Sequence, residues 1–278
     1  MKKISRRSFL AAAAVSAAAL ALTACGGSAS SAASSVASSA ASSEAASSAA
    51  TAELTTVEAG KLTMATNAAF PPYEMTTDAG EFEGIDIETA QAIADKLGLE
   101  LQIDDMDFDA ALLSVQQGKA DIVMAGVTVT DERKAVMDFS DSYATGIQSI
   151  IVPNDSDIAS PDDLAGKKIG TQRGTTGYIY CSDDFGDENV VAYDDGLTAV
   201  QALNNGQVDA VVIDNAPAQE FVAANPGLKV LDTSYAEEDY AIGMAKGSAL
   251  EDAVNKALEE LKADGTLQAI VDKYINAN

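Results

Sequence analysis

Short apolar runs alternate along this chain with longer segments whose apolar residues recur at helical spacing. Residues 62–66 and 169–171 are β-like runs, and a loop follows each of them. Residues 85–98 carry isoleucine, alanine and leucine on one helical face and end in a glycine, which suits a helix C-cap. Strands that alternate with helices in this way predict an α/β fold with mainly parallel sheets.

An internal repeat extends this prediction. Residues 110–126 and 198–214 align at an offset of 88, and each copy reads as a helix, a glycine and then an apolar strand. The residues that the two copies share are Ala111/Ala199, Gly118/Gly206, Asp121/Asp209 and Val123/Val211. Chance similarity is the alternative, since αβ units are built alike. Two units of one design predict two similar α/β lobes.

The end of the chain predicts two further helices. Ser248 and Glu251 have the spacing of a capping box, which would begin a helix that ends at Gly265. Thr266 would then cap a last helix that continues through Tyr274.

The first 24 residues have the pattern of an export signal. Basic residues precede the apolar run 9–22, which is too short to span a bilayer comfortably. Segment 22–26 (LTACG) resembles the lipobox of bacterial lipoproteins, in which the Cys25 thiol is lipidated and the chain is cleaved before it. An ordinary signal peptide is the alternative, and Arg6-Arg7 leaves both the Sec and the twin-arginine export routes open.

Residues 26–53 are almost wholly serine, alanine and glycine, a composition that cannot bury enough apolar surface to fold. A flexible tether of this length would span about 30 Å on average. We therefore expect residues 25–53 to be a lipidated cysteine and a tether. The folded part, from about Leu54, would be held at the outer face of the cytoplasmic membrane.

Composition narrows the possible functions. The 278 residues suit two modest domains, and 47% of them are apolar, enough for real cores. A net charge of −26 repels nucleic acid and anionic lipid. The chain has no histidine, so histidine-based catalysis and the commonest metal ligand are absent. We expect no metal, no cofactor and no catalytic residue. If Cys25 carries a lipid, Cys181 has no partner for an intrachain disulfide.

Two charged residues stand at predicted carboxyl ends of strands, where open sheets bind ligands. Arg133 lies at a predicted helix start and could grip a carboxylate, while Asp214 could pair with an ammonium. Together they suit a zwitterion, whose two charges both need partners when they leave water. The alternatives are a surface arginine paired with Asp131, and an aspartate that caps the next helix. Phe70 and Phe108 could form an apolar wall, although core packing is the default.

Several short motifs occur together in the expected order. Segment 84–88 (GIDIE), followed by Ile93-Ala94 and Leu97, matches a family signature, with Thr89 where an apolar residue is usual. Further matching segments are 68–74 (AAFPPYE), 107–108 (DF), 128–133 (TVTDER), 138–140 (DFS), 265–266 (GT) and 273–274 (KY). With these motifs, residues 54–278 resemble the family-three extracellular solute-binding proteins, the polar amino acid receptors of ABC importers.

The resemblance implies which residues hold the ligand's α-carboxylate. Arg133 would bind it, helped by Thr128 and by the backbone of Gly126. Thr176, in the turn that begins at Gly174, would add donors to the same carboxylate.

The other ligand groups also receive partners from the resemblance. Asp214 would bind the α-ammonium, and Phe70 and Phe108 would sandwich the side chain. Asn67 occupies a position that often carries an acid reading the ligand's distal group, so asparagine there argues weakly against a strongly cationic ligand.

The fold that the resemblance implies is the two-lobed periplasmic-binding-protein-like fold of type II, with mixed, mainly parallel sheets and a hinge of two strands. Lobe one would be residues 54–145 plus 242–278, and lobe two residues 146–241. The implied function is to capture a free polar amino acid between the lobes and deliver it to the permease and ATPase of an ABC importer. We expect a monomer and not an enzyme.

Two other functions fit the same scaffold. One is a dehydratase, with Glu74 as the candidate acid, and the other is a ligand sensor for signalling. The sequence identifies neither the amino acid nor the permease, and it assigns no role to Cys181 or Arg173.

Overall fold

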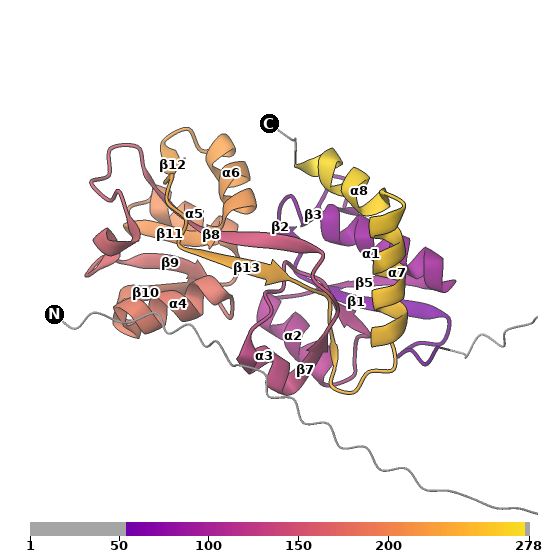
Figure 1. The fold of residues 1–278 in the computed structure, drawn as a ribbon. Helices are drawn as coiled ribbons and strands as arrows, with labels where there is room; N and C mark the ends of the chain where they lie inside the picture. The colour runs from indigo at the N-terminus through magenta and orange to yellow at the C-terminus, as the bar shows by residue number, and fades with distance from the viewer. Residues whose placement is uncertain (1–53, 276–278) are drawn as a thin grey trace, which may run out of the picture. The chain divides into compact units, whose positions relative to one another are not determined.

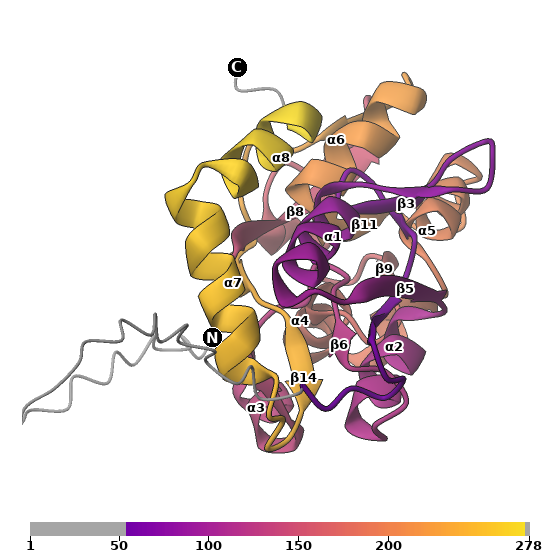
Figure 2. The ribbon, with the colours of Figure 1, turned by 90° about the vertical axis from the view of Figure 1, so that its right-hand side faces the viewer.

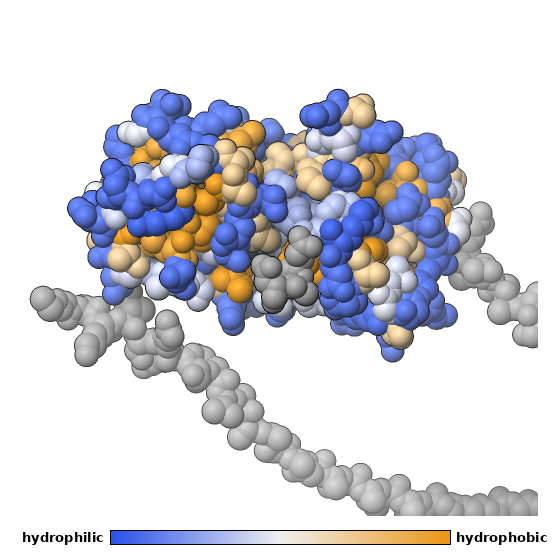
Figure 3. Space-filling view, turned by 90° about the horizontal axis from the view of Figure 1, so that it is seen from above, coloured by the Kyte–Doolittle hydropathy of each residue, from blue (hydrophilic) through white to orange (hydrophobic). Residues whose placement is uncertain are grey.

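Two large β-sheets, each covered by helices, organise the part of the chain that this computed structural model describes, residues 54–275 (Figure 1). The predicted export signal, Cys25 and the tether lie outside these residues. Within 54–275, no helix is both long and apolar enough to cross a membrane. Hydrophilic side chains cover most of the face seen in Figure 3, and a larger apolar area is visible within the left-hand half of that face.

The first lobe is built on a sheet with the strand order β5-β1-β6-β14-β7. Its strands are β1 (Lys61–Thr66), β5 (Glu100–Asp105), β6 (Ile122–Val123), β7 (Met137–Phe139) and β14 (Gly243–Ala245). Strand β1 is parallel to β5 and β6, whereas β14 is antiparallel to β6 and β7. A separate small sheet beside α1 contains β2 (Ala69–Phe70), β3 (Glu74–Thr76) and β4 (Phe82–Glu83).

Helices pack on both faces of this first sheet. They are α1 (Ile85–Leu97), α2 (Phe108–Gln116), α3 (Asp131–Val136), α7 (Glu251–Ala263) and α8 (Thr266–Tyr274). Figure 2 shows α1, α7 and α8 together on one side, and α2 lies on the other. Met64 belongs to the core shared with α1, while the next residue, Ala65, packs with α2. Strand β1 is thus buried on both faces, as a central parallel strand requires.

The second lobe is built on a sheet with the order β10-β9-β11-β8-β12, and a further strand, β13, pairs with β8. Its strands are β8 (Ala144–Pro153), β9 (Ile169–Gln172), β10 (Val190–Tyr193), β11 (Ala210–Asp214), β12 (Leu228–Val230) and β13 (Ala236–Tyr240). Its helices are α4 (Thr176–Phe185), α5 (Gly196–Asn204) and α6 (Asn215–Ala224), with short 3₁₀ turns η1 (Pro161–Leu164) and η2 (Asp187–Asn189).

The predicted repeat is present in both lobes. Helix α2 is followed by Gly118 and β6, and helix α5 is followed by Gly206 and β11. The two glycines have φ values of 65° and 66°, the left-handed conformation that a side chain disfavours. The α/β class and the two lobes are therefore confirmed.

Both predicted caps near the C-terminus are wrong. Helix α7 begins at Glu251, after a turn in which the Leu250 N–H donates to Ser248 Oγ at 3.2 Å, so no capping box forms. Helix α8 begins at Thr266 itself, and the Thr266 N–H donates to Asp264 Oδ1 at 3.0 Å. The aspartate two residues earlier replaces the predicted threonine as acceptor.

The chain passes between the lobes at two adjacent strands. Strand β8 begins at Ala144, directly after the first sheet, and β13 ends at Tyr240, just before the chain returns to that sheet as β14. These two strands are antiparallel, with Ala144 opposite Tyr240. The lobe boundaries that we predict at 145/146 and 241/242 fall beside this pair.

Gly146, in β8, is the position at this junction where a side chain would meet most resistance. A Cβ there would lie 2.5 Å from Tyr240 Cε1 and 2.7 Å from its hydroxyl oxygen, and Tyr240 is fully buried. We expect Gly146→Ala to lower the free energy of unfolding by about 1–3 kcal/mol through overpacking. Urea denaturation measures this, with Gly227→Ala as control because a Cβ there meets nothing within 4 Å. Equal stability of the two variants would contradict the expectation.

Candidate ligand-binding site

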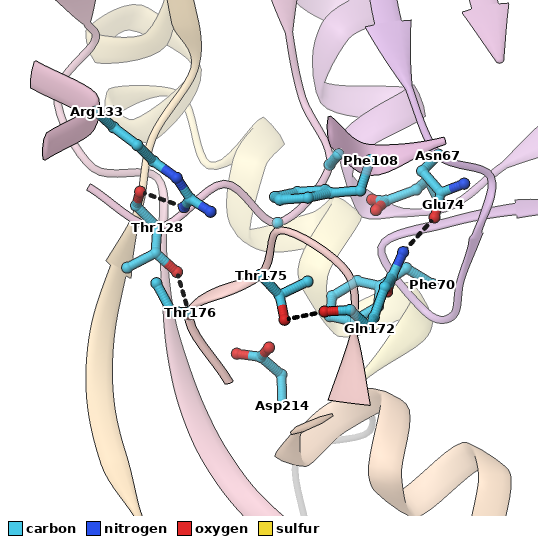
Figure 4. A pocket seen from close by; sticks show the side chains of 12 residues that line it. Asn67, Phe70, Glu74, Phe108, Thr128, Arg133, Gln172, Thr175, Thr176 and Asp214 are labelled. Atoms are coloured by element: carbon cyan, nitrogen blue, oxygen red, sulfur yellow. Dashed lines mark hydrogen bonds between the residues drawn. The ribbon is translucent and has the colours of Figure 1, made fainter. Parts of the chain in front are cut away.

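Residues from both lobes surround one pocket at the carboxyl ends of β1, β6, β9 and β11 (Figure 4). Its empty space, including the part open to solvent, is about 310 Å³. From the first lobe it is lined by Asn67, Phe70, Glu74, Phe108, Ala125, Gly126, Thr128 and Arg133. From the second lobe it is lined by Gln172, Thr175, Thr176 and Asp214.

The predicted ligand-binding residues therefore come together. All of them except Gly174 line the pocket, and Gly174 lies beside it, because its carbonyl accepts a hydrogen bond from Arg133 Nη2 at 3.1 Å. Their roles toward a ligand stay predictions.

Arg133 is held in the pocket wall by the first turn of α3. Its N–H donates to the capping Thr130 Oγ1, and its Nη1 donates to the Thr128 carbonyl at 2.8 Å. The guanidinium carbon lies 5.4 Å from the centre of the Phe108 ring. Only 8% of Arg133 is exposed, so the alternative of a surface arginine is wrong. Burial lowers the pKa of Arg133, but an arginine stays charged at any physiological pH.

Asp214 enters the pocket from the end of β11. Its carboxylate accepts hydrogen bonds from Gln148 Nε2 at 2.8 Å and from the Tyr240 hydroxyl. It stands at the N-cap position of α6, but its side chain makes no capping bond, so the capping alternative is wrong. Burial raises the pKa of Asp214 to about 7, opposed by the Tyr240 bond and assisted by the charge of Glu238. A cation beside this carboxylate would restore its charge.

Gly126 lets the pocket wall approach an aromatic ring. Its φ is 54°, and a Cβ there would lie 2.9 Å from Phe70 Cε1. The resemblance gave the Gly126 backbone to the ligand's carboxylate. In the structure its N–H instead donates to Asp86 Oδ2 at 3.0 Å, and Tyr143 donates to the same oxygen at 2.7 Å. This N–H is therefore already committed.

Glu74 is a pocket residue that we considered only as an acid catalyst. It is fully buried, and neither carboxyl oxygen has a well-formed hydrogen bond within residues 54–275, although the Asp86 carboxyl lies close enough to interact with it. Burial first, and then the charge of the nearby Asp86, raises the pKa of Glu74 well above its ordinary value. The sequence signal was the segment Pro71-Pro72-Tyr73-Glu74, which follows the strand end that carries Asn67 and Phe70.

Gln172 and Thr175 also line the pocket without having been singled out. Gln172 Nε2 donates to Asn67 Oδ1 across the two lobes at 2.8 Å, and Thr175 caps α4. Asn67 Nδ2 in turn donates to the Met106 carbonyl at 2.9 Å, so both ends of this amide have protein partners. Gln172 directly follows the β-like run predicted at 169–171, but the sequence could not show which side chain after that run turns inward.

Arg173 and Cys181 lie away from the pocket. Arg173 is exposed and forms a 3.6 Å ion pair with Asp194, and Cys181 is fully buried in the core of the second lobe.

Known proteins of similar sequence and fold bind amino acids. The chain is 34% identical over 225 residues to the L-cystine-binding protein TcyJ of Escherichia coli K12, covering 80% of this chain and 85% of that protein. The crystal structure of ArtJ, an arginine-, lysine- and histidine-binding protein of Geobacillus stearothermophilus, superposes with a TM-score of 0.75 at 34% identity. That superposition covers 78% of this chain and 96% of ArtJ.

A third match is closer in sequence. An ancestral arginine-binding protein bound to arginine is 42% identical, with a TM-score of 0.74, over 78% of this chain and 99% of that one. These structures confirm the predicted fold class, the two-lobed α/β fold of type II periplasmic binding proteins.

The family assignment follows from the sequence profile. The profile of one family matches residues 62–277, almost the whole folded part, and confirms the resemblance carried by the short motifs. The chain belongs to the bacterial extracellular solute-binding proteins, family 3.

Proposed function

We propose that this protein is the substrate-binding component of an ABC importer, and that it binds a free amino acid between its lobes. The single observation that carries the proposal is the placement of Arg133 and Asp214. A guanidinium from the first lobe and a carboxylate from the second line one small pocket, and Figure 4 shows both side chains directed into it. An α-amino acid presents the two complementary charges, and both need partners once they are buried.

The same arrangement explains how binding is coupled to closure of the lobes. A ligand shifts a conformational equilibrium only through a difference in its affinity for the two forms. Arg133 and Asp214 can hold one zwitterion only when the lobes are together, so the ligand favours that form. In this structure the lobes already touch through polar contacts, Arg133 with Gly174 and Gln172 with Asn67.

We further propose that the ligand's side chain is cationic. Glu74 offers a buried carboxyl on the pocket wall, whose oxygens have no well-formed hydrogen bond in the described part of the chain and whose neighbour Asp86 is another acid. A cationic group there would pair with Glu74 and remove the cost of its burial. ArtJ and the ancestral protein are named for arginine, which supports this class of ligand. In the sequence, asparagine at position 67 argued weakly against a cationic ligand. In the structure, however, the Asn67 amide is hydrogen-bonded to Gln172 and to the Met106 carbonyl.

The proposal includes export and anchoring. Residues 1–24 would be the signal peptide, and lipid on Cys25 would hold the protein on the outer face of the cytoplasmic membrane. There it would act as a monomer, without catalysis, and deliver its ligand to the permease and ATPase. Mass spectrometry of the mature protein would test the anchor, since an unmodified Cys25 thiol would contradict it.

A thermal-shift screen against the common L-amino acids tests the proposed function. We expect arginine, lysine or histidine to raise the melting temperature most, because a ligand that binds only the native state stabilises it. A protein that none of the amino acids stabilises would contradict the proposal. Loss of uptake of the same amino acid on deletion would separate transport from a purely signalling role.

Glu74→Gln tests the ligand class. The change removes a carboxyl that can ionise beside a cation but keeps its shape, so we expect affinity for L-arginine to fall about tenfold or more while affinity for L-glutamine changes little. Titration calorimetry with both amino acids measures this. Glu83→Gln is the matched control, because it makes the same change in an exposed residue of the same small sheet. Equal losses for both amino acids would contradict the assignment to a cation.

A further inference from the structure

Glu238, on β13, makes contacts that neither the sequence nor the family profile assigned. It is 6% exposed, and its Oε2 accepts three hydrogen bonds. The donors are Thr128 Oγ1 at 3.1 Å, Thr176 Oγ1 at 2.9 Å and Gln148 Nε2 at 2.9 Å. Thr128 belongs to the first lobe, and the other residues belong to the second. One buried carboxylate oxygen therefore collects hydrogen bonds from both sides of the pocket.

The two threonines are the residues that the family resemblance gave to the ligand's α-carboxylate. Each hydroxyl has one hydrogen to donate and lone pairs with which to accept. When that hydrogen points to Glu238, it cannot also point to a ligand carboxylate. The two hydroxyl oxygens also lie 3.4 Å from each other, and Gln148 Nε2 lies 3.4 Å from Thr176 Oγ1, but the contacts of both hydroxyls with Glu238 are shorter. With both hydrogens directed to Glu238, Thr128 and Thr176 present their remaining lone pairs to the pocket that they line.

Gln148 connects this group to Asp214. Its Nε2 amide contacts three acceptors, Asp214 Oδ2 at 2.8 Å, Glu238 Oε2 at 2.9 Å and, at the longer distance of 3.4 Å, Thr176 Oγ1. The two hydrogens of the amide serve the two nearer acceptors, which are both carboxylate oxygens. The side chains around Thr128 and Thr176 thus include two buried carboxylates. Such a region attracts a cation and repels an anion.

We propose that Glu238 is a positioning residue that makes this end of the pocket specific for the ligand's α-ammonium. It orients the hydroxyl hydrogens of Thr128 and Thr176 away from the ligand, so that both oxygens accept from the ammonium beside Asp214. The α-carboxylate is then left to Arg133 and to backbone N–H groups. This inference rests on the proposed function, and it changes the role of the two threonines from donors to acceptors.

The experiment compares two ligands in three proteins. The ligands are L-arginine and 5-guanidinopentanoic acid, which keeps the guanidinium and the carboxylate but lacks the α-ammonium. The proteins are the parent, Glu238→Gln and the control Glu237→Gln, which removes the same charge from the exposed neighbour on β13. If the screen selects another amino acid, that amino acid and its des-amino analogue take their places.

We expect Glu238→Gln to weaken L-arginine about tenfold or more and to change the affinity of the des-amino acid less than about threefold. Glu237→Gln should leave both unchanged. A residue that only holds the lobes together would, when changed, weaken both ligands equally, and that result would overturn the proposal. Unchanged affinity for L-arginine would overturn it as well.

Thr176→Val provides an independent test, should Glu238→Gln fold poorly. A hydroxyl that accepts from the ammonium is missed by L-arginine alone, whereas a hydroxyl that donates to the carboxylate is missed by both ligands. Where the analogue binds too weakly to titrate, the double variant Glu238→Gln/Thr176→Val decides. If Glu238 acts through Thr176 and Thr128, the double variant should bind L-arginine about as well as whichever single variant binds it less tightly. Losses that add up in the double variant would overturn the proposal.

The outcomes separate this inference from the proposed function. If the parent protein binds no amino acid, both fail. If the parent binds one and Glu238→Gln does not discriminate between the ligand pair, only the role of Glu238 fails.

Discussion

Replacing Arg133 by alanine should reduce amino acid affinity at least about 100-fold and leave the fold intact. The guanidinium is the only side-chain cation among the residues that line the pocket, so its loss leaves the ligand's carboxylate buried without a charged partner. The protein loses two hydrogen bonds to backbone carbonyls and one stacking contact, which we expect to cost about 1–2 kcal/mol of stability. Titration calorimetry measures the affinity, and a melting curve measures the fold.

Arg173→Ala is the matched control for this variant. These are the two arginines that follow Cys25, and Arg173 is exposed and away from the pocket. We expect its removal to leave affinity unchanged, because exposed ion pairs contribute little. If Arg133→Ala still binds the amino acid with nearly the affinity of the parent protein, the proposal that Arg133 and Asp214 hold the two charges of the ligand is wrong. Equal effects of the two variants would point to the loss of overall charge instead.

Much of the fold could be predicted because its strongest signals are local. The repeat at 110–126 and 198–214 combines an apolar strand with a glycine at a helix end, and both features depend on neighbouring residues alone. The caps of α7 and α8 failed for a related reason. Several polar side chains close to each helix start compete for the same N–H groups, and the sequence does not show which one the chain brings within reach. Asp264 reached the Thr266 N–H in place of the predicted cap.

The candidate site also contains residues that local sequence patterns reveal and residues that only the folded structure reveals. Asp214 ends a predicted strand, where the rule about open sheets expects a ligand, and Arg133 stands at the predicted helix start after another strand, so local patterns found both. Glu238 lies inside β13, 24 residues after Asp214, among other acids of an ordinary acidic segment. Only the pairing of β13 with β8 brings Glu238 next to Gln148 and Thr176. Glu74 was visible in its motif, but the sequence could not show that both of its oxygens are buried without a well-formed hydrogen bond in the described part of the chain.

Asp214→Asn should abolish binding and, without amino acid, make the protein more stable than the parent at pH 8. Burial raises the pKa of Asp214 from 3.8 to about 7, so the folded protein favours the protonated carboxyl. The stability that this group contributes is fully present below about pH 4 and is lost as the pH rises through 7. Asp86, with a pKa raised to about 6 by burial, acts in the same direction.

Asparagine resembles the protonated form at every pH. We therefore expect the variant to gain about 1–2 kcal/mol over the parent at pH 8 and nothing at pH 4, as measured by urea unfolding at both values. The ligand's ammonium favours the charged carboxylate, so the parent should release a proton on binding near pH 6.5 and bind more tightly at pH 8 than at pH 5. Calorimetry in buffers of different ionisation enthalpy measures the proton. If the variant is less stable than the parent at pH 8, or if the parent binds without releasing a proton, Asp214 is already charged in the empty pocket. The ligand's ammonium would then pair with a carboxylate that is already ionised, and binding would not change the protonation of Asp214.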